Sequence, residues 1–124
     1  MSEFNLANQK FLLNCQYGTD NLERATIMFI LATSASKTSE TAVFISSNAT
    51  DLCVRGALDG LVAKGYEPLA DLVAQYQANG GLIWVCPVCV KAKGLAQEDL
   101  LPGVEIAGAP RTTAYLASGA RLLA

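Results

Sequence analysis

Short apolar segments alternate with longer segments of helical character along this chain, and this alternation restricts the fold more than any other sequence feature. The apolar segments lie at residues 10–15, 42–45, 82–85, 104–107 and 121–123. Short apolar strands separated by helices are typical of a parallel sheet that helices cover on both faces. We therefore expect a three-layer α/β/α fold with a five-stranded, mainly parallel sheet, in a single domain of residues 1–124.

The segments between these strands carry helix signals. Asp20, with Glu23 three residues later, predicts an N-cap for a helix over residues 21–35. Pro68 begins the clearest amphipathic helix, because apolar side chains then recur at helical spacing. These side chains are Leu69, Leu72, Val73 and Tyr76. One or two helical turns are expected over residues 89–94, and another helix over residues 111–119.

The segment that follows the second strand is harder to interpret. Asn48 is expected to cap a short helix that carries Leu52 and Cys53. Residues 55–66 contain three glycines, at positions 56, 60 and 65. Because glycine weakens a helix, we expect a short helix there that runs into a mobile loop.

The composition favours an oligomer. Apolar residues make up 52% of the chain and charged residues only 16%. A protein of 124 residues exposes much of its surface, so part of this apolar content is expected to meet another subunit. The predicted helix over residues 21–35 is apolar on every side at positions 27–31, which suggests that a neighbouring copy covers it. The sequence therefore predicts a homo-oligomer.

Charge and hydropathy argue against several other partners. Nine basic and eleven acidic residues give a net charge of −2, with no basic tract, so nucleic acid is not an expected partner. The uncharged apolar stretch of residues 25–36 is too short to cross a bilayer as a helix. The first ten residues lack a basic segment followed by an apolar one, so we expect a cytoplasmic protein with reduced cysteines.

The strongest chemical signal is a pair of cysteines directly after the third strand, in the sequence VCPVCVKAKG. If the segment is helical, Pro87 takes the first helical position and Cys86 the N-cap, where free N–H groups favour a thiolate. Lys91 and Lys93 add positive charge nearby. Cys89 lies one turn further on, within reach of Cys86 for attack or for a disulfide.

Several interpretations of this pair remain open. A zinc site needs four ligands, but the chain has no histidine and its other cysteines, Cys15 and Cys53, are isolated, so neither a metal nor a cofactor is predicted. A thioredoxin-type dithiol matches the C-x-x-C spacing, although that motif normally follows an early strand. Two buried thiols without chemistry are a further possibility. Cys15 ends the first strand and can approach the same edge, but core packing is the expected role for it and for Cys53.

The chain also resembles a known family. The segments that carry the resemblance are YGTDNLERA, GYEPLADLVAQYQANGG, IWVCPVCVKAKGL and EDLLPGVEIAGA. Together they resemble the DsrE/DsrF-like proteins, which have a DsrEFH-like fold and are linked to sulfur relay. In relay members the cysteine after the third strand accepts sulfur as a persulfide and passes it on, and this position matches Cys86. The resemblance also implies a trimer or hexamer and protein partners that donate and accept sulfur.

We therefore expect a sulfur carrier that holds a persulfide on Cys86, with Cys89 as a thiol that releases or protects the sulfur. One alternative is a thiol-disulfide oxidoreductase that uses both cysteines. Another is a non-catalytic oligomeric binding module whose cysteines are structural. The sequence does not name the sulfur donor, the acceptor or the pathway.

Overall fold

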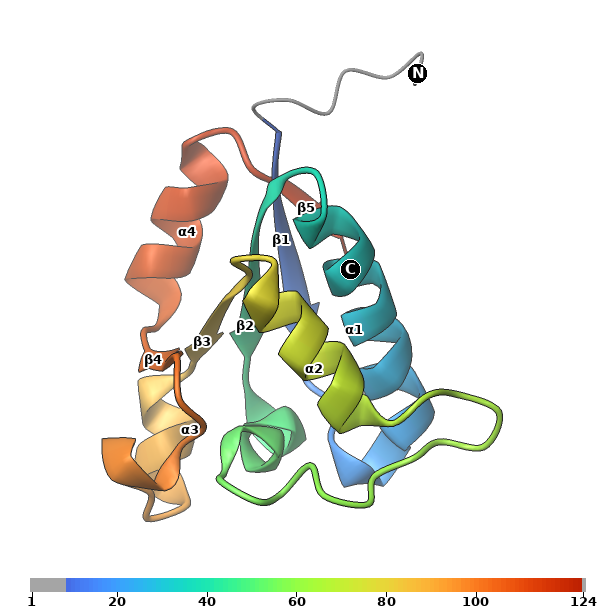
Figure 1. Cartoon of the computed structure of the whole chain (residues 1–124). Helices are drawn as coiled ribbons and strands as arrows, with labels where there is room; N and C mark the ends of the chain where they lie inside the picture. The colour runs from blue at the N-terminus through green and yellow to red at the C-terminus, as the bar shows by residue number, and fades with distance from the viewer. Residues whose placement is uncertain (1–8, 124) are drawn as a thin grey trace.

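The computed structural model describes residues 9–123, which form a sheet between layers of helices (Figure 1). These residues contain five strands, which are β1 (Lys10–Cys15), β2 (Glu40–Ile45), β3 (Leu82–Val85), β4 (Val104–Ile106) and β5 (Arg121–Leu123). The strands form one sheet in the order β4-β3-β2-β1-β5, and every neighbouring pair is parallel. The predicted α/β/α class and five-stranded sheet are confirmed.

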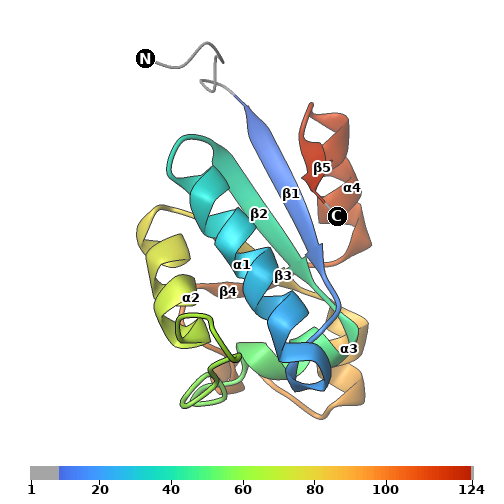
Figure 2. The same cartoon turned by 90° about the vertical axis from the view of Figure 1, so that its right-hand side faces the viewer.

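Helical segments connect these strands. The α-helices are α1 (Leu22–Ser36), α2 (Leu69–Ala78), α3 (Pro87–Ala92) and α4 (Ala109–Ala117), and the 3-10 helices are η1 (Thr19–Asn21), η2 (Ser47–Cys53) and η3 (Gln97–Asp99). Helices α1 and α2 cover one face of the sheet and α4 covers the other (Figure 1). Helix α3 and the segment after β2 lie together at the carboxyl end of the sheet (Figure 2).

The amphipathic pattern of α2 is confirmed. The side chains of Leu69, Leu72, Val73 and Tyr76 are all buried. The Tyr76 hydroxyl lies 2.7 Å from the Leu82 carbonyl and 3.1 Å from the Thr41 carbonyl, so it ties α2 to two strands. A Cβ atom at Gly81 would collide with the Tyr76 ring, so this close approach depends on glycine.

The opposite face of the sheet is smaller and packs against α4. Leu12, Ala42 and Trp84, from three neighbouring strands, pack against Tyr115 and Leu116. The Trp84 and Tyr115 rings meet edge to face with centroids 5.2 Å apart. Because helices bury both faces of the central strands, consecutive apolar residues such as Leu12 and Leu13 are both buried, and the strands do not alternate strictly between apolar and polar residues.

Two helices begin at other residues than the sequence predicts. The N-cap of α1 is Asn21 and not Asp20, since the Asn21 side chain accepts a hydrogen bond of 3.2 Å from the Arg24 N–H. Helix α4 begins at Ala109, two residues before the predicted start, because Pro110 has the φ angle that the first helical turn needs. The other strands and α-helices agree with the prediction to within two residues: α3 spans Pro87–Ala92 where turns over residues 89–94 are expected, and β2 begins at Glu40 where a strand from residue 42 is expected.

The segment after β2 differs most from the prediction. Asn48 does not cap a helix, because it lies inside η2, and its side-chain amide donates to the Asp20 carboxylate at 3.1 Å. The N-cap of η2 is instead Ser46. Residues 55–66 consist of turns and extended chain, not a short helix. Leu58 and Ala63 are nevertheless buried, so their side chains pack this segment against the core although it has no regular secondary structure.

Helix α1 is covered on one side by its own chain. Met28 and Phe29 are buried, whereas Ile27, Ile30 and Leu31 are 40%, 37% and 44% exposed. The outer side of α1 is thus apolar and open within the single chain. This is the surface on which the expectation of an oligomer depends.

Within residues 9–123, none of the helices has both the length and the apolar character needed to cross a membrane. The expectation that the chain lacks a leader concerns mainly residues 1–8, which lie outside the described residues.

Candidate functional site

The carboxyl ends of the central strands lie side by side, and this alignment creates the candidate site. Ile45 of β2 pairs with Val85 of β3, and Val85 pairs with Ile106 of β4. Pairing continues one residue further, since the Cys86 N–H donates to the Ile45 carbonyl at 2.9 Å. The segments after these strands therefore leave the sheet together, at the edge where open parallel sheets collect ligands and reacting groups.

Cys86 occupies the predicted position. It is the N-cap of α3, Pro87 is the first helical residue, and the Cys86 carbonyl accepts a hydrogen bond from the Val90 N–H at 3.0 Å. The thiol is half-buried. The side chain accepts no capping hydrogen bond from the described N–H groups of α3, a helix of only six residues. The end of α3 therefore does not stabilise a Cys86 thiolate through a capping hydrogen bond.

Cys89 has a more structured environment, which comes from the segment after β2. The backbone N–H of Ser47 donates to the Cys89 Sγ at 3.3 Å. Among the described non-glycine residues, Ser47 alone has a positive φ, of 54°. This backbone conformation costs about 1–2 kcal/mol for an ordinary residue. It coincides with an N–H group that points at a thiol.

These contacts lower the pKa of the Cys89 thiol. The largest cause is the Ser47 N–H, which favours the thiolate, and partial burial opposes it. Hydrogen bonds with Cys86 and Thr50 and the positive charge of Lys93 lower the pKa further. These contacts therefore favour the thiolate form of Cys89 relative to an isolated cysteine.

Thr50 is the least expected member of this site. Its side chain is completely buried, and among the described residues its Oγ1 has no hydrogen-bond partner of ordinary geometry. The hydroxyl is nevertheless close enough to Cys89 to lower the pKa of that thiol. An unpaired buried hydroxyl costs about 1–3 kcal/mol, so ionisation of Cys89 would supply the acceptor that Thr50 lacks.

Lys93 brings a positive charge to the same end of the molecule. Its Nζ lies 3.2 Å from a carboxylate oxygen of Asp51, in the segment that also carries Ser47 and Thr50. Both side chains remain partly exposed, so this ion pair contributes little to stability. Its effect is to hold the ammonium group near Cys89, whose pKa it lowers.

An open hollow of about 810 Å³ adjoins Cys86. Phe44, Pro87 and Val88 line one part of it, and the segment from Ile106 to Arg111 lines the rest. It is mainly apolar, with the Arg111 guanidinium near its rim, where that group also pairs with Glu105. The two cysteines thus have different surroundings, because Cys86 borders the hollow and Cys89 contacts the segment after β2.

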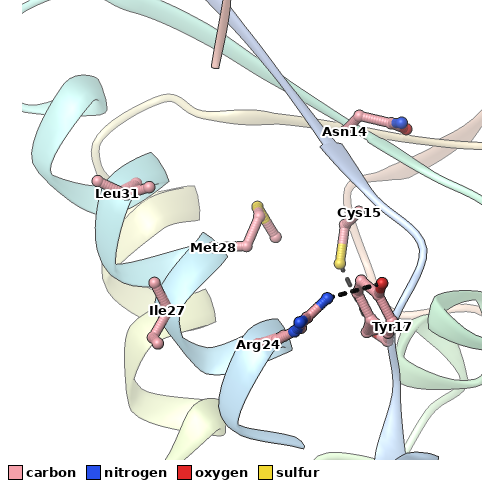
Figure 3. A pocket seen from close by; sticks show the side chains of 7 residues that line it. All are labelled: Asn14, Cys15, Tyr17, Arg24, Ile27, Met28 and Leu31. Atoms are coloured by element: carbon pink, nitrogen blue, oxygen red, sulfur yellow. Dashed lines mark hydrogen bonds between the residues drawn. The ribbon is translucent and has the colours of Figure 1, made fainter. Parts of the chain in front are cut away.

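The other two cysteines lie in the core, as expected. Burial raises the pKa of Cys15 to about 11 and that of Cys53 to about 12. Cys15 lines a separate hollow of about 270 Å³ beside α1, where the Arg24 side chain donates to the Tyr17 hydroxyl at 2.9 Å (Figure 3). The Cys15 thiol donates weakly to the Tyr17 carbonyl at 3.5 Å, so it is engaged away from Cys86.

Sequence analysis did not identify Ser47 and Thr50. The signal that could have indicated them is the serine pair directly after the apolar strand at residues 42–45. Parallel strands end at one edge of the sheet, so residues that follow two such strands can lie close together. Within residues 9–123, the Cys, Asp and Glu side chains do not gather in groups of three or more that could hold a metal ion.

Solved structures share this fold. The chain is similar to the ychN protein of Escherichia coli, with a TM-score of 0.69 and 19% identity over 94% of this chain and 97% of that one. It is also similar to MTH1491, a protein of unknown function from Methanobacterium thermoautotrophicum. That match has a TM-score of 0.67 and 14% identity, over 94% of this chain and 97% of the other. At these identities the likeness shows the fold alone.

Sequence comparisons identify the family as well as the fold. The chain is 31% identical over 110 residues to the uncharacterized protein MJ0760 of Methanocaldococcus jannaschii, a match that covers 88% of this chain. It spans only 40% of the length of that relative. Residues 9–124 match the model of the DsrE/DsrF-like family, which is nearly the whole sequence. The chain therefore belongs to the DsrE/DsrF-like family.

Proposed function

We propose that this protein carries sulfur as a persulfide on Cys86. The observation that carries the proposal is the position of Cys86, a half-buried thiol that borders an open hollow and has a second thiol one helical turn away. The family to which the chain belongs is associated with sulfur relay. In the sulfur-relay members that the sequence resembles, the cysteine after the third strand carries sulfur, and this position matches Cys86.

The loading step needs a single nucleophile. The Cys86 thiolate attacks the outer sulfur of a donor persulfide, R–S–SH, so that a new S–S bond forms on Cys86 and the S–S bond of the donor breaks. The donor leaves as the thiolate R–S⁻, and the proton stays on the transferred sulfur. No oxidant or metal is consumed. The hollow beside Cys86 offers room for the donor segment, and its apolar lining favours a protein partner over a charged metabolite.

Mass spectrometry of the intact protein and of its peptides tests this proposal. Incubation with a cysteine desulfurase and cysteine is expected to add one sulfur atom to the wild type and to Cys89→Ser, at a peptide that contains residue 86. Cys86→Ser is expected to gain none at this turn. Loading that persists in Cys86→Ser would contradict the proposal, provided that circular dichroism shows the variant to be folded.

The Cys86 and Cys89 pair also supports a second candidate, a thiol-disulfide oxidoreductase. The observation that favours it is the lowered pKa of Cys89 beside a second thiol, because the thiolate is the reactive form of a cysteine. Reduction of insulin disulfides that requires both cysteines would establish this activity. If neither loading nor reduction occurs, the remaining candidate is the non-catalytic binding module.

We further propose that the carrier is a homo-oligomer. The partly exposed apolar side chains of Ile27 and Leu31 line the hollow beside α1 (Figure 3), and Ile30 on the same helix is also exposed. A second copy of the chain would cover this surface, whereas Cys86 lies on another element, at the carboxyl end of β3. Sulfur donor and acceptor proteins would then meet the hollow beside Cys86.

A further inference from the structure

We propose that Ser47, Thr50 and Lys93 form a sulfur-anion site that holds Cys89 as a thiolate, and that this thiolate discharges the persulfide on Cys86 as hydrosulfide. The discharge step rests on the proposed function, whereas the anion site does not. The site is built from a segment remote in sequence, since Ser47 lies 42 residues before Cys89.

Three kinds of group converge on the Cys89 sulfur. The Ser47 N–H donates to it directly at 3.3 Å. The buried Thr50 hydroxyl, which lacks another partner among the described residues, lies near enough to act on the same sulfur. The Lys93 ammonium supplies positive charge and is held in place by Asp51 at 3.2 Å. Two donors and a cation are suited to an anion, because a neutral thiol accepts hydrogen bonds only weakly.

The neighbouring groups include one that acts in the opposite direction. Asp51 faces Lys93 from η2, and its carboxylate offsets part of the ammonium charge. Partial burial of Cys89 also disfavours the thiolate. The donation from Ser47 outweighs these effects, because the pKa of Cys89 is lowered overall. The neutral donors Ser47 and Thr50 are therefore expected to matter more than Lys93.

The position of this anion determines which reaction it performs. Cys89 lies within hydrogen-bond reach of the Cys86 sulfur, which becomes the inner sulfur once Cys86 carries a persulfide. The Cys89 thiolate attacks this inner sulfur, a Cys86–Cys89 disulfide forms, and the outer sulfur leaves as HS⁻ with its proton. The outer sulfur is thereby reduced and the two cysteine sulfurs are oxidised, so the step itself needs no other reactant. A dithiol reductant is needed to open the disulfide before a second turnover.

This arrangement would limit how long the protein holds sulfur. A persulfide that meets an acceptor quickly is passed on intact, whereas one that waits is released as hydrosulfide. Ser47, Thr50 and Lys93 act through Cys89, so they are positioning residues and not catalytic ones. Their effect should therefore depend on pH in the way that the ionisation of Cys89 does.

The first experiment measures the anion site without any sulfur donor. The rate of iodoacetamide alkylation of Cys89 is followed by peptide mass spectrometry between pH 5 and pH 10, in a Cys86→Ser background where Cys89 titrates without its neighbour. We expect Thr50→Val to shift the alkylation profile to higher pH and to slow Cys89 at pH 7 about fivefold. Lys93→Met is expected to slow it about twofold, because its charge is exposed and already paired.

Matched variants control for effects on structure. Thr41→Val removes a hydroxyl from another buried threonine, and Lys91→Met removes a lysine from the same helix. Neither change should move the profile of Cys89. Valine has nearly the shape of threonine, so Thr50→Val is expected to fold, and the exposed Lys93 provides a second test. An unchanged Cys89 profile in both Thr50→Val and Lys93→Met would overturn the anion site.

The second experiment measures discharge. After loading, we expect the wild type to lose its persulfide and form the Cys86–Cys89 disulfide with release of one hydrosulfide, and Thr50→Val to do so about fivefold more slowly at pH 7. Cys89→Ser should keep its persulfide. Equal lifetimes in all three proteins would overturn the discharge step. If Cys86 does not load at all, the proposed function and the discharge step both fail, while a shifted Cys89 profile would still support the anion site.

Discussion

Raising the pH from 8 to 10 should destabilise this protein through its two buried thiols, and a variant of Cys53 isolates half of the effect. Burial raises the pKa of Cys53 from 9.0 to about 12, and that of Cys15 from 9.0 to about 11. An acid whose pKa is raised by folding stabilises the folded state while it is protonated in both states. The contribution is therefore complete below the unfolded pKa of 9.0 and is lost as the pH rises above it.

The magnitude depends on few assumptions. A pH of 10 lies one unit above the unfolded pKa of 9.0. At this pH the Cys53 thiol is mostly ionised in the unfolded chain and still protonated in the folded chain. One unit corresponds to about 1.4 kcal/mol of unfolding free energy. The same figure results for any folded pKa near or above 11, so the prediction does not depend on the exact value. Cys15 and Cys53 together account for about 2.7 kcal/mol between pH 8 and pH 10.

Urea unfolding under reducing conditions measures this difference. Cys53→Ala should lose about 1.4 kcal/mol less stability than the wild type between pH 8 and pH 10, whatever its stability at pH 8. Val73→Ala, in the same core, is the control, because it removes apolar contacts but no ionisable group and should cost the same at both pH values. Parallel pH dependences for the wild type and Cys53→Ala would refute the assignment of this loss to the thiol.

Two further predictions concern packing and assembly. Gly81→Ala should reduce stability by about 2 kcal/mol in urea unfolding, because the new Cβ meets the Tyr76 ring, and a loss below about 0.5 kcal/mol would contradict the proposed contact. Light scattering at micromolar concentration should give the mass of a trimer or hexamer, which Leu31→Lys should lower by placing a charge on the exposed apolar side of α1. A monodisperse species of 13.1 kDa for the wild type would refute the oligomer.

Features that depend on neighbouring residues could be predicted well from the sequence. Strand β3 has the predicted bounds of Leu82–Val85, because a short apolar run between a Gly-Gly pair and a proline permits little else. The stripe of α2 and the position of Cys86 as N-cap of α3 also follow from local spacing. In each case tertiary packing stabilises the conformation that the local sequence already favours.

Features that depend on strand order could not be predicted in the same way. Asp20 and Asn48 both have side chains suited to helix capping, but they bond to each other across 28 residues of sequence. That contact forms because β1 and β2 are neighbours and their carboxyl ends align. A capping preference is worth about 1 kcal/mol, which a tertiary contact between two polar side chains readily matches.

The different surroundings of Cys86 and Cys89 could not be predicted from the C-x-x-C motif for the same reason. The C-x-x-C spacing places Cys86 and Cys89 one turn apart, but their surroundings come from the ends of different strands. Pairing of β2 with β3 brings Ser47 to Cys89, whereas pairing of β3 with β4 places Cys86 beside the hollow. Had the strand order been different, the same motif would have lacked the Ser47 donor, which is the largest cause of the lowered pKa of Cys89. The environment of the two cysteines therefore depends on the order of the strands in the sheet. The Thr50 and Lys93 variants test this dependence at the Cys89 sulfur, where the segment after β2 meets α3.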